Sequence, residues 1–292
     1  MALSHPLTQT ISLCDGRQLG FAEWGDPEGS PVFFFHGMPS SRLNGHADSS
    51  VLIARSARWI AIDRPGLGLS DFQPRRTLLD WPGDVVELAD QLGLDRFAVV
   101  GNSAGGPYAA ACAYKIPDRL TYAAIVSGVA PIDRLARDEQ RKRARWAPWY
   151  GRAQIAATAL AARRWPEWAY RKVLKSMPEA DRQIAARPEV RDALVAAFLE
   201  AVRSGSHGVQ YEMSLHAKPW GFALEEILVH IDLWHGDQDT NVPLTDGRLL
   251  AEAIPNSSLN VCEGVAHMLI ESRFEEILRS VTRQTGERVE LS

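Results

Sequence analysis

The chain has 292 residues, of which 46% are hydrophobic and 23% charged, and its formal net charge is −4 at pH 7. This composition is typical of a globular protein, and the length allows one large α/β core with an inserted subdomain or two modest domains. The small negative charge gives no reason to expect nucleic acid or an anionic membrane as a partner. No apolar run approaches the ~18 residues that a membrane-spanning helix requires.

The N-terminus and the cysteines both favour a cytoplasmic protein. The first twenty residues have no basic start, no sustained apolar stretch and no small-residue cleavage site, so they do not have the features of a signal peptide. Cys14, Cys112 and Cys262 are far apart, odd in number and without C-x-x-C spacing. This usage predicts reduced thiols rather than a disulfide framework or a metal site.

The first half of the chain alternates between strand and helix patterns. Residues 8–24 alternate loosely around Asp15-Gly16, which predicts a β-hairpin at the edge of a sheet. Short apolar runs at 32–36, 59–63 and 97–101 suit parallel strands that are covered on both faces. Helical spacing or small-residue content predicts helices over 77–94 and 104–116, and a further strand is expected over 120–128.

The pattern changes between Pro131 and about Gly221, where alanine and arginine dominate and five of the nine tryptophans occur. Strand patterns resume at 227–235 and 258–262, followed by predicted helices over 245–253 and 274–283. The alternation predicts an α/β fold, a doubly wound and mostly parallel sheet with an inserted helical cap. The predicted core comprises residues 1–130 and 222–292, and the predicted cap comprises residues 131–221.

One predicted strand-to-helix turn carries a candidate nucleophile. Residues 101–105, GNSAG, match the pattern G-x-S-x-G, in which a tight turn lifts a serine hydroxyl above the carboxyl end of a sheet. Glycine and serine also occur together in ordinary loops, so the five residues alone are weak evidence. The strand before them and the helix after them favour a nucleophilic Ser103.

A serine nucleophile needs a base and a group that orients the base. His267 is the best candidate base because it follows the last strand, the serine and an acidic turn, in the order Ser, Asp, His. We interpret His235 as structural, and His36 lies where a backbone donor is more useful than a base. In the acidic turn, Asp237 and Asp239 both have the required carboxylate, and one of them is expected to cap the turn.

Five ordered motifs resemble those of carboxylesterase-like serine hydrolases with the α/β-hydrolase fold. They are HGMP at 36–39, DRPGLGLSD at 63–71, GNSAG at 101–105, GDQDTNVP at 236–243 and GVAH at 264–267. The match extends over roughly residues 8–285, the cap excepted. In related dehalogenases and epoxide hydrolases the nucleophile is an aspartate, so Ser103 argues against both.

The resemblance implies a role for each matching residue. It makes Ser103 the nucleophile, His267 the base and Asp239 the acid, with the backbone N–H groups of Met38 and Ala104 as the oxyanion hole. Asp133 is a distant alternative to Asp239, because the acid of this family can move to the end of that strand.

The other notable residues have a structural and a functional interpretation. Arg64 could contact substrate, but the DRPG turn is expected to shape the loop beside the oxyanion strand. The basic run at 141–145 is interpreted as a solvated face of the cap rather than a membrane or nucleic-acid patch. An apolar substrate pocket is expected beneath the cap. The candidate lining residues are His36, Trp146, Trp149, Trp168, Met177 and Met213.

The predicted function is a cytoplasmic serine hydrolase, a carboxylesterase acting on a small or medium ester without a metal or organic cofactor. Three alternatives use the same fold: a carbon–carbon bond hydrolase acting on vinylogous diketo acids, a proline-releasing aminopeptidase and a non-enzymatic ligand receptor. The stretch GGPY at 105–108 faintly resembles the aminopeptidases, and an acidic pair in the cap would favour them. Apart from a small-molecule substrate, the one partner considered is a second copy of the chain in a homodimer.

Overall fold

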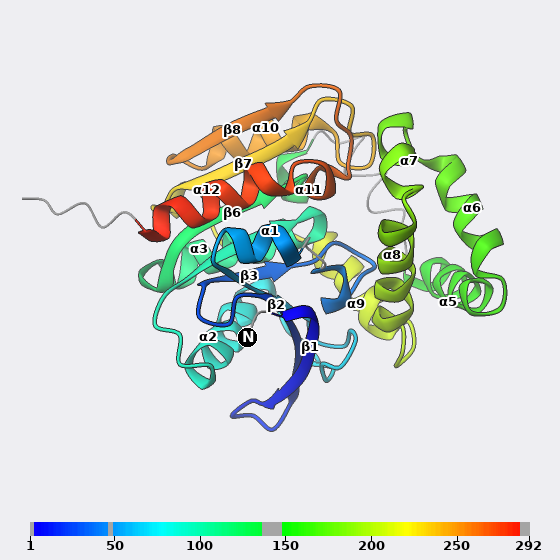
Figure 1. The fold of residues 1–292 in the computed structure, drawn as a ribbon, viewed down its shortest axis with the longest axis horizontal. Helices are drawn as coiled ribbons and strands as arrows, with labels where there is room; N and C mark the ends of the chain where they lie inside the picture. Colours follow the sequence, from blue (N-terminus) through cyan, green and yellow to red (C-terminus); the bar gives the residue numbers. More distant parts are fainter. Residues whose placement is uncertain (1–2, 46–48, 136–147, 287–292) are drawn as a thin grey trace, which may run out of the picture.

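The computed structural model describes residues 3–45, 49–135 and 148–286. Its centre is an eight-stranded sheet with the strand order β1-β2-β4-β3-β5-β6-β7-β8 (Figure 1). The strands are β1 (Leu3–Ser12), β2 (Gln18–Gly25), β3 (Ser30–Phe35), β4 (Ala57–Ile62), β5 (Phe97–Asn102), β6 (Leu120–Val126), β7 (Ile231–Gly236) and β8 (Ser257–Cys262). β2 pairs antiparallel with β1 and β4, and all other neighbours are parallel, which confirms the predicted α/β class and mostly parallel sheet.

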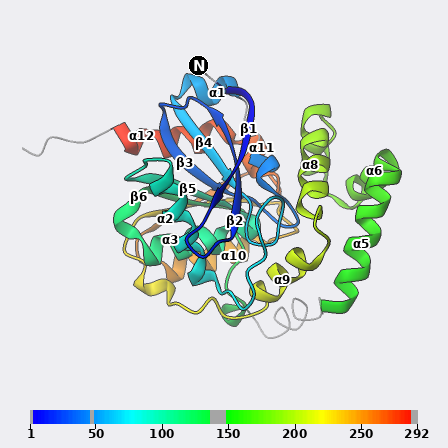
Figure 2. The ribbon, with the colours of Figure 1, turned by 90° about the horizontal axis from the view of Figure 1, so that it is seen from below.

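Helices cover both faces of the sheet (Figures 1 and 2). One face packs against α2 (Trp81–Gln91), α3 (Gly106–Lys115) and α10 (Leu244–Ala253), and the other against α1 (Ser49–Ala54), α11 (Leu269–Ser272) and α12 (Phe274–Gly286). Successive side chains of β3 alternate between these layers, because side chains of a strand point to opposite faces. Phe35 meets Trp81 of α2 with ring centroids 5.3 Å apart, and Phe34 stacks on Trp59 at 5.2 Å. Each fully buried Phe contributes roughly 1.5–3 kcal/mol to folding.

Most predicted strands and helices of the core agree with the structure, although β1 begins at Leu3 rather than at residue 8 and the short helix α11 is not predicted. Two further differences have a clear physical reason. β7 begins at Ile231 rather than Ile227, because residues 224–226 form a 3₁₀ turn and Leu228 is 79% exposed. Helix α1 is not predicted from the sequence. It has six residues, of which only Leu52 is buried, so it is too short to show a helical period.

In the described part of the chain between β6 and β7 there are five helices, and we call them the helical insertion. They are α5 (Pro148–Arg164), α6 (Pro166–Ser176), α7 (Glu179–Ala185), α8 (Pro188–Ala201) and α9 (His207–His216). In both ribbon views α8 and α9 lie next to the sheet, and α5 and α6 lie outermost (Figures 1 and 2). An ion pair of 2.8 Å between Arg42 and Glu200 fastens α8 to the turn Arg42–Gly45, which follows β3. The boundaries 131 and 221 for a separate cap domain remain a prediction.

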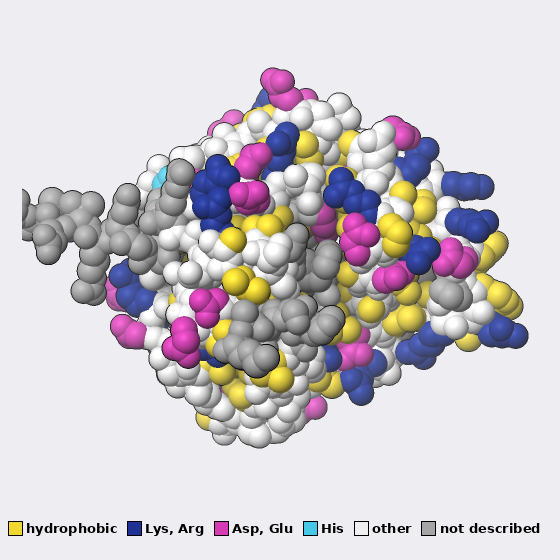
Figure 3. Space-filling model, viewed as in Figure 1, with side chains coloured by type: hydrophobic (Ala, Val, Ile, Leu, Met, Phe, Trp, Pro, Cys, Tyr) yellow, Lys and Arg dark blue, Asp and Glu magenta, His cyan; other side chains and the backbone are white. Residues whose placement is uncertain are grey.

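The outer helices of the insertion carry much of its positive charge (Figure 3). Among the side chains that the structure describes in α5 and α6, the exposed cations are Arg163, Arg164, Arg171, Lys172 and Lys175. The basic run at 141–145 lies outside the described residues. Within the described ranges, no helix has the length and apolar character that would be needed to cross a membrane.

Candidate active site

Ser103 lies in the tight turn between β5 and α3, with φ +53°, a left-handed conformation that residues other than glycine rarely adopt. A Cβ atom on Gly101 would lie 2.4 Å from the carbonyl oxygen of Gly105, and one on Gly105 would lie 2.0 Å from that of Phe35. Both glycines are therefore required by close approach of the backbone. The turn places the serine hydroxyl at the carboxyl end of the sheet, as G-x-S-x-G turns do.

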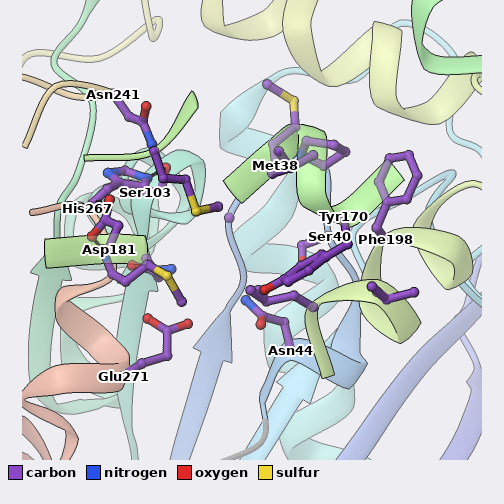
Figure 4. Close-up of a pocket in the computed structure, with 18 of the residues that line it drawn as sticks. Met38, Ser40, Asn44, Ser103, Tyr170, Asp181, Phe198, Asn241, His267 and Glu271 are labelled. Atoms are coloured by element: carbon purple, nitrogen blue, oxygen red, sulfur yellow. Dashed lines mark hydrogen bonds between the residues drawn. The ribbon is translucent and has the colours of Figure 1, made fainter. Parts of the chain in front are cut away.

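Three side chains from the ends of three strands form a continuous hydrogen-bonded relay. The Oγ of Ser103 lies 3.0 Å from Nε2 of His267, and Nδ1 of His267 lies 2.7 Å from Oδ2 of Asp239. Figure 4 shows Ser103 and His267 side by side. Because the carboxylate accepts, Nδ1 carries the ring proton and Nε2 is free to accept the serine proton. This is the arrangement in which a serine can be activated as a nucleophile.

The neighbourhood of Asp239 distinguishes it from the other acidic candidates. Its side chain is inaccessible to solvent, and its Oδ1 accepts 2.9 Å hydrogen bonds from the amides of Asn241 and Val242. Asp237 is exposed and accepts a 2.8 Å hydrogen bond from the amide of Gly264, which is the expected turn-capping role. Asp133 is exposed in the turn Ile132–Arg134. Of the three carboxylates, Asp239 is the one that contacts His267.

His235 has a structural environment. It is 1% exposed, and its Nε2 donates a 2.8 Å hydrogen bond to the carbonyl oxygen of Val242. Gly247 packs so closely that a Cβ atom there would lie 2.7 Å from the imidazole. The ring therefore packs beneath the Asp239 turn and supports it.

Asp181 of α7 holds the backbone of the histidine turn. Its two carboxylate oxygens accept hydrogen bonds of 3.1 and 2.8 Å from the amides of His267 and Met268. Burial raises the pKa of Asp181, although these two amides act to lower it. This residue is not among those predicted from the sequence, because nothing within α7 signals a contact with a turn 86 residues further along the chain.

Glu271 is a second acidic residue that is not predicted from the sequence. It lies four residues after His267, in the short helix α11, and lines the same cavity (Figure 4). Burial raises the pKa of Glu271 to about 7, although its own backbone amide and His267 act to lower it. For His267, burial acts to lower the pKa, but the hydrogen bond and charge of Asp239, together with Asp181 and Glu271, raise the pKa above its usual value.

The two backbone donors that the resemblance implies flank Ser103. Met38 lies directly after Gly37, where a Cβ atom would lie 3.5 Å from Cβ of Ser103. Ala104 directly follows the serine. Among the described residues, none accepts a hydrogen bond from the amide of Met38. This amide is therefore free to donate to a bound oxyanion.

A cavity of about 390 Å³ opens beside Ser103 and His267, beneath the helical insertion. Its polar end carries Asp181, Glu271 and Asn241, and its far wall comes from α6 and α8 (Figure 4). The apolar residues of this wall are Tyr170, Val173, Leu194, Val195 and Phe198, and Met177, directly after α6, also lines the cavity. A mostly apolar cavity with a few convergent polar groups is the usual form of a small-molecule site.

The predicted lining residues lie in different places. Met177 lines the cavity, whereas His36, Trp168 and Met213 lie outside its lining. His36 is fully buried beneath the oxyanion loop, and Met213 packs behind the wall, in the apolar cluster that also holds Leu67 and the lining residue Phe198. Trp168 is 53% exposed, because the neighbouring Ala169 and Tyr170 occupy the face of α6 that meets the cavity. Trp146 and the side chain of Trp149 lie outside the described residues.

Three curated relatives are similar over different lengths. A non-heme chloroperoxidase from Streptomyces lividans is 32% identical over 42% of this chain and 45% of its own length. A bifunctional esterase/perhydrolase from Acinetobacter calcoaceticus is 27% identical over 42% of this chain and 45% of its own. A 2-hydroxymuconate semialdehyde hydrolase from Pseudomonas putida is 25% identical over 87% of this chain and 86% of its own. The chain thus spans less than half the length of the first two relatives.

The fold similarity extends over nearly the whole length of the chain. The crystal structure of a hydrolase from Pseudomonas aeruginosa PA01 superposes with a TM-score of 0.72, covering 96% of this chain and 98% of that one, at 21% sequence identity. The sequence profile of the alpha/beta hydrolase fold matches residues 30–274, which include the serine turn, the Asp239 turn and His267. The chain therefore belongs to the alpha/beta hydrolase fold family.

Proposed function

We propose that this hydrolase is a serine carboxylesterase that cleaves a small or medium ester through an acyl-enzyme on Ser103. The observation that carries the proposal is the relay from Asp239 through His267 to Ser103, which opens directly into the cavity under the insertion. A buried carboxylate, a histidine with one free nitrogen and a serine in a strained turn are the parts that acyl transfer requires.

In the proposed reaction, Oγ of Ser103 attacks the ester carbonyl carbon while Nε2 of His267 takes the hydroxyl proton. The tetrahedral intermediate collapses, the bond to the alcohol oxygen breaks, and His267 returns the proton to that oxygen. Water then gives a proton to His267 and attacks the acyl carbon, and collapse of the second intermediate releases the acid and re-protonates Ser103. Asp239 stabilises the imidazolium in both halves of the reaction.

The proposed oxyanion hole consists of the amides of Met38 and Ala104. Negative charge develops on the carbonyl oxygen only as the tetrahedral state forms, so these donors stabilise the transition state more than the bound ester. Gly37 has no side chain that would fill the space beside Ser103, which leaves room for the carbonyl oxygen.

The charges around the cavity argue against the carbon–carbon hydrolase alternative. The relative from Pseudomonas putida suggests that activity. A hydrolase of this kind that acts on diketo acids must bind a substrate carboxylate. Among the described lining residues, none is a lysine or arginine, whereas Asp181 and Glu271 are acidic. A substrate carboxylate there would find no counter-ion among these residues, which disfavours its binding.

The same two carboxyl groups support a second candidate, an aminopeptidase that releases an N-terminal residue. Asp181 comes from the insertion and Glu271 follows the histidine turn, so the two form an acidic pair at the polar end of the cavity. The positively charged ammonium group of a substrate could donate hydrogen bonds to these two carboxyl groups. Each oxygen of Asp181 already accepts one backbone amide, so Glu271 is the freer of the two.

A substrate panel separates the candidate functions. It comprises p-nitrophenyl esters of increasing acyl length, proline p-nitroanilide and a vinylogous diketo acid. Turnover of the esters alone would support the carboxylesterase. Preferential turnover of the anilide would indicate the aminopeptidase instead, and preferential turnover of the diketo acid would indicate the carbon–carbon hydrolase. A lack of turnover for all three classes, with a melting temperature that rises on ligand addition, would favour the receptor.

The pH profile of ester hydrolysis follows from the state of His267. Below its pKa the ring is protonated and cannot accept the serine proton, so kcat/KM is expected to rise through one ionisation with its midpoint above 6.5. Glu271→Gln is expected to move the midpoint to lower pH, because the carboxylate helps to raise the pKa of His267. Glu275→Gln, at an exposed position on α12, is the control. A profile without a rising limb would contradict histidine-based activation.

The cavity wall predicts selectivity for acyl length. One methylene of fit is worth roughly 1–3 kcal/mol in an apolar pocket, so wild type should show a clear optimum in kcat/KM along the ester series. Phe198→Ala should shift that optimum toward longer chains, because its ring lies in the wall. Trp168→Ala removes an exposed aromatic ring of the insertion and should leave the profile unchanged. An identical profile for wild type and Phe198→Ala would mean that acyl groups do not reach this wall.

A further inference from the structure

Beneath the oxyanion loop, the carbonyl oxygen of Gly37 is held by two buried side chains. Nη2 of Arg64 donates a 3.1 Å hydrogen bond to it, and Nδ1 of His36 lies 2.8 Å from it. Nη1 of Arg64 also donates to the carbonyl oxygen of His36 at 2.6 Å. Arg64 and His36 are both fully buried, so water does not compete for these hydrogen bonds.

The carbonyl of Gly37 and the amide of Met38 belong to the same peptide unit. That unit is trans and planar, so the direction of its C=O determines the direction of its N–H. Hydrogen bonds accepted by the carbonyl also polarise the amide, which strengthens it as a donor. Arg64 therefore acts on the proposed oxyanion donor from the opposite side of its peptide.

The guanidinium of Arg64 is in turn held by the insertion. Its Nε donates a 2.8 Å hydrogen bond to Oε2 of Glu212, which lies on α9 and is fully buried. Oε1 of Glu212 accepts hydrogen bonds from Arg76 and from the hydroxyl of Tyr108, whose ring lies 4.8 Å beneath the Arg64 guanidinium. Burial acts to raise the pKa of Glu212, but Arg64 and Arg76 outweigh it, so the pKa lies well below the usual value and the group is ionised.

Stability alone does not account for this cluster. Removing two guanidinium groups and a carboxylate from water carries a large desolvation penalty, and apolar replacements of buried ion pairs are often neutral or stabilising. The cluster also has two guanidinium groups for one carboxylate, and one of them, that of Arg64, donates directly to the peptide that would face the oxyanion. Its geometry suits orientation and electrostatic stabilisation of that peptide.

We propose that Arg64 and Glu212 are positioning residues that align and polarise the Gly37–Met38 peptide before substrate binds. The inference rests on the proposed function, because it assigns the amide of Met38 to the oxyanion hole. It adds that the insertion supplies a charged residue to this alignment through Glu212. Gly208 of α9 contributes to the same contact, since a Cβ atom there would lie 1.9 Å from the carbonyl oxygen of Gly66 in the DRPG turn.

The test compares Arg64→Lys and Glu212→Gln with Glu200→Gln. Glu200 lies on α8 of the insertion and, like Glu212, pairs with an arginine of the core. This arginine, Arg42, does not contact the Gly37 carbonyl. We measure kcat and KM for p-nitrophenyl esters, together with the affinity for an aryl trifluoromethyl ketone that forms a tetrahedral adduct with Ser103. Loss of one oxyanion donor typically lowers kcat by ~10²–10³-fold, so misalignment should lower it by roughly tenfold to a hundredfold.

For Arg64→Lys and Glu212→Gln we expect kcat to fall by this factor while KM stays nearly unchanged. The affinity for the ketone should fall by the same factor as kcat. Glu200→Gln should match wild type in all three quantities. A merely structural role would lower the melting temperature and the active fraction without changing the ratio of KM to the ketone inhibition constant. A ratio within threefold of wild type in both folded variants would overturn the proposal.

Tyr108→Phe provides a milder variant if the charge changes prevent folding. It removes one hydrogen bond to Glu212 and keeps the buried ring, so the ratio should fall in the same direction by a smaller factor. An unchanged ratio in Tyr108→Phe would then overturn the proposal. If wild type itself neither hydrolyses esters nor forms an adduct on Ser103, the proposed function fails, which is a different result from loss of the positioning effect.

Discussion

Ser103→Ala is expected to abolish ester hydrolysis and labelling by a fluorophosphonate probe while the protein remains folded. Removal of a triad serine typically costs about 10⁶-fold in kcat, because no other group can form the acyl-enzyme. The substitution removes a hydroxyl but leaves the tight turn, whose close contacts involve Gly101 and Gly105. The measurements are steady-state kinetics, probe labelling with mass-spectrometric mapping, and circular dichroism.

The matched control for this substitution is Ser127→Ala. Ser127 is also a serine with positive φ at the end of a parallel strand, here β6, and it is fully buried. It takes no part in the relay through His267, so the control should retain both hydrolysis and labelling. Normal labelling of Ser103→Ala, with the adduct on another residue, would falsify the nucleophile assignment.

Asp239→Asn is expected to lower kcat by ~10³–10⁴-fold, because an amide favours the wrong tautomer of the histidine and does not stabilise the imidazolium. Asn can still accept the amide hydrogen bonds of Asn241 and Val242, so the turn should persist. The measurement is kcat on a p-nitrophenyl ester with active-site concentration determined by titration.

Asp237→Asn is the control for the acid, because it lies two residues away in the same turn. Its carboxylate accepts a hydrogen bond from the amide of Gly264, and an asparagine oxygen can do the same. We therefore expect a change of no more than a few fold. The reverse ranking of the two variants would mean that the acid has been misplaced.

Much of the fold can be predicted because its signals are local. Parallel strands buried on both faces appear as short apolar runs, and β3, β4 and β5 lie where those runs occur. Helix α1 escapes prediction because six residues with one buried side chain carry no period. The predicted start of β7 is too early because Ile227 is buried like a strand residue although it follows a 3₁₀ turn.

The wall of the cavity could not be predicted, since it depends on which face of each helix meets the core. Large apolar side chains make tryptophans natural candidates for the wall, yet Trp168 faces solvent beside Lys172. The wall residue Phe198 carries no pattern that separates it from other apolar residues of α8. His36 is likewise a candidate for the pocket by its position in the sequence, but its imidazole points to the Gly37 carbonyl beneath the loop.

The sequence by itself determined the strand–helix alternation, the tight turn at Ser103 and the candidate identities of His267 and the acidic turn, because each depends on residues that are neighbours along the chain. The motif resemblance already favoured Asp239 over Asp237, and the tertiary structure shows that Asp239 contacts His267. Only the tertiary structure decided that Asp181 holds the histidine turn and that Glu212 reaches Arg64. These contacts join segments separated by up to 148 residues, as between Arg64 and Glu212. Residues so far apart in the sequence meet only because the whole sheet and the insertion pack together, and no local pattern of residues encodes that packing.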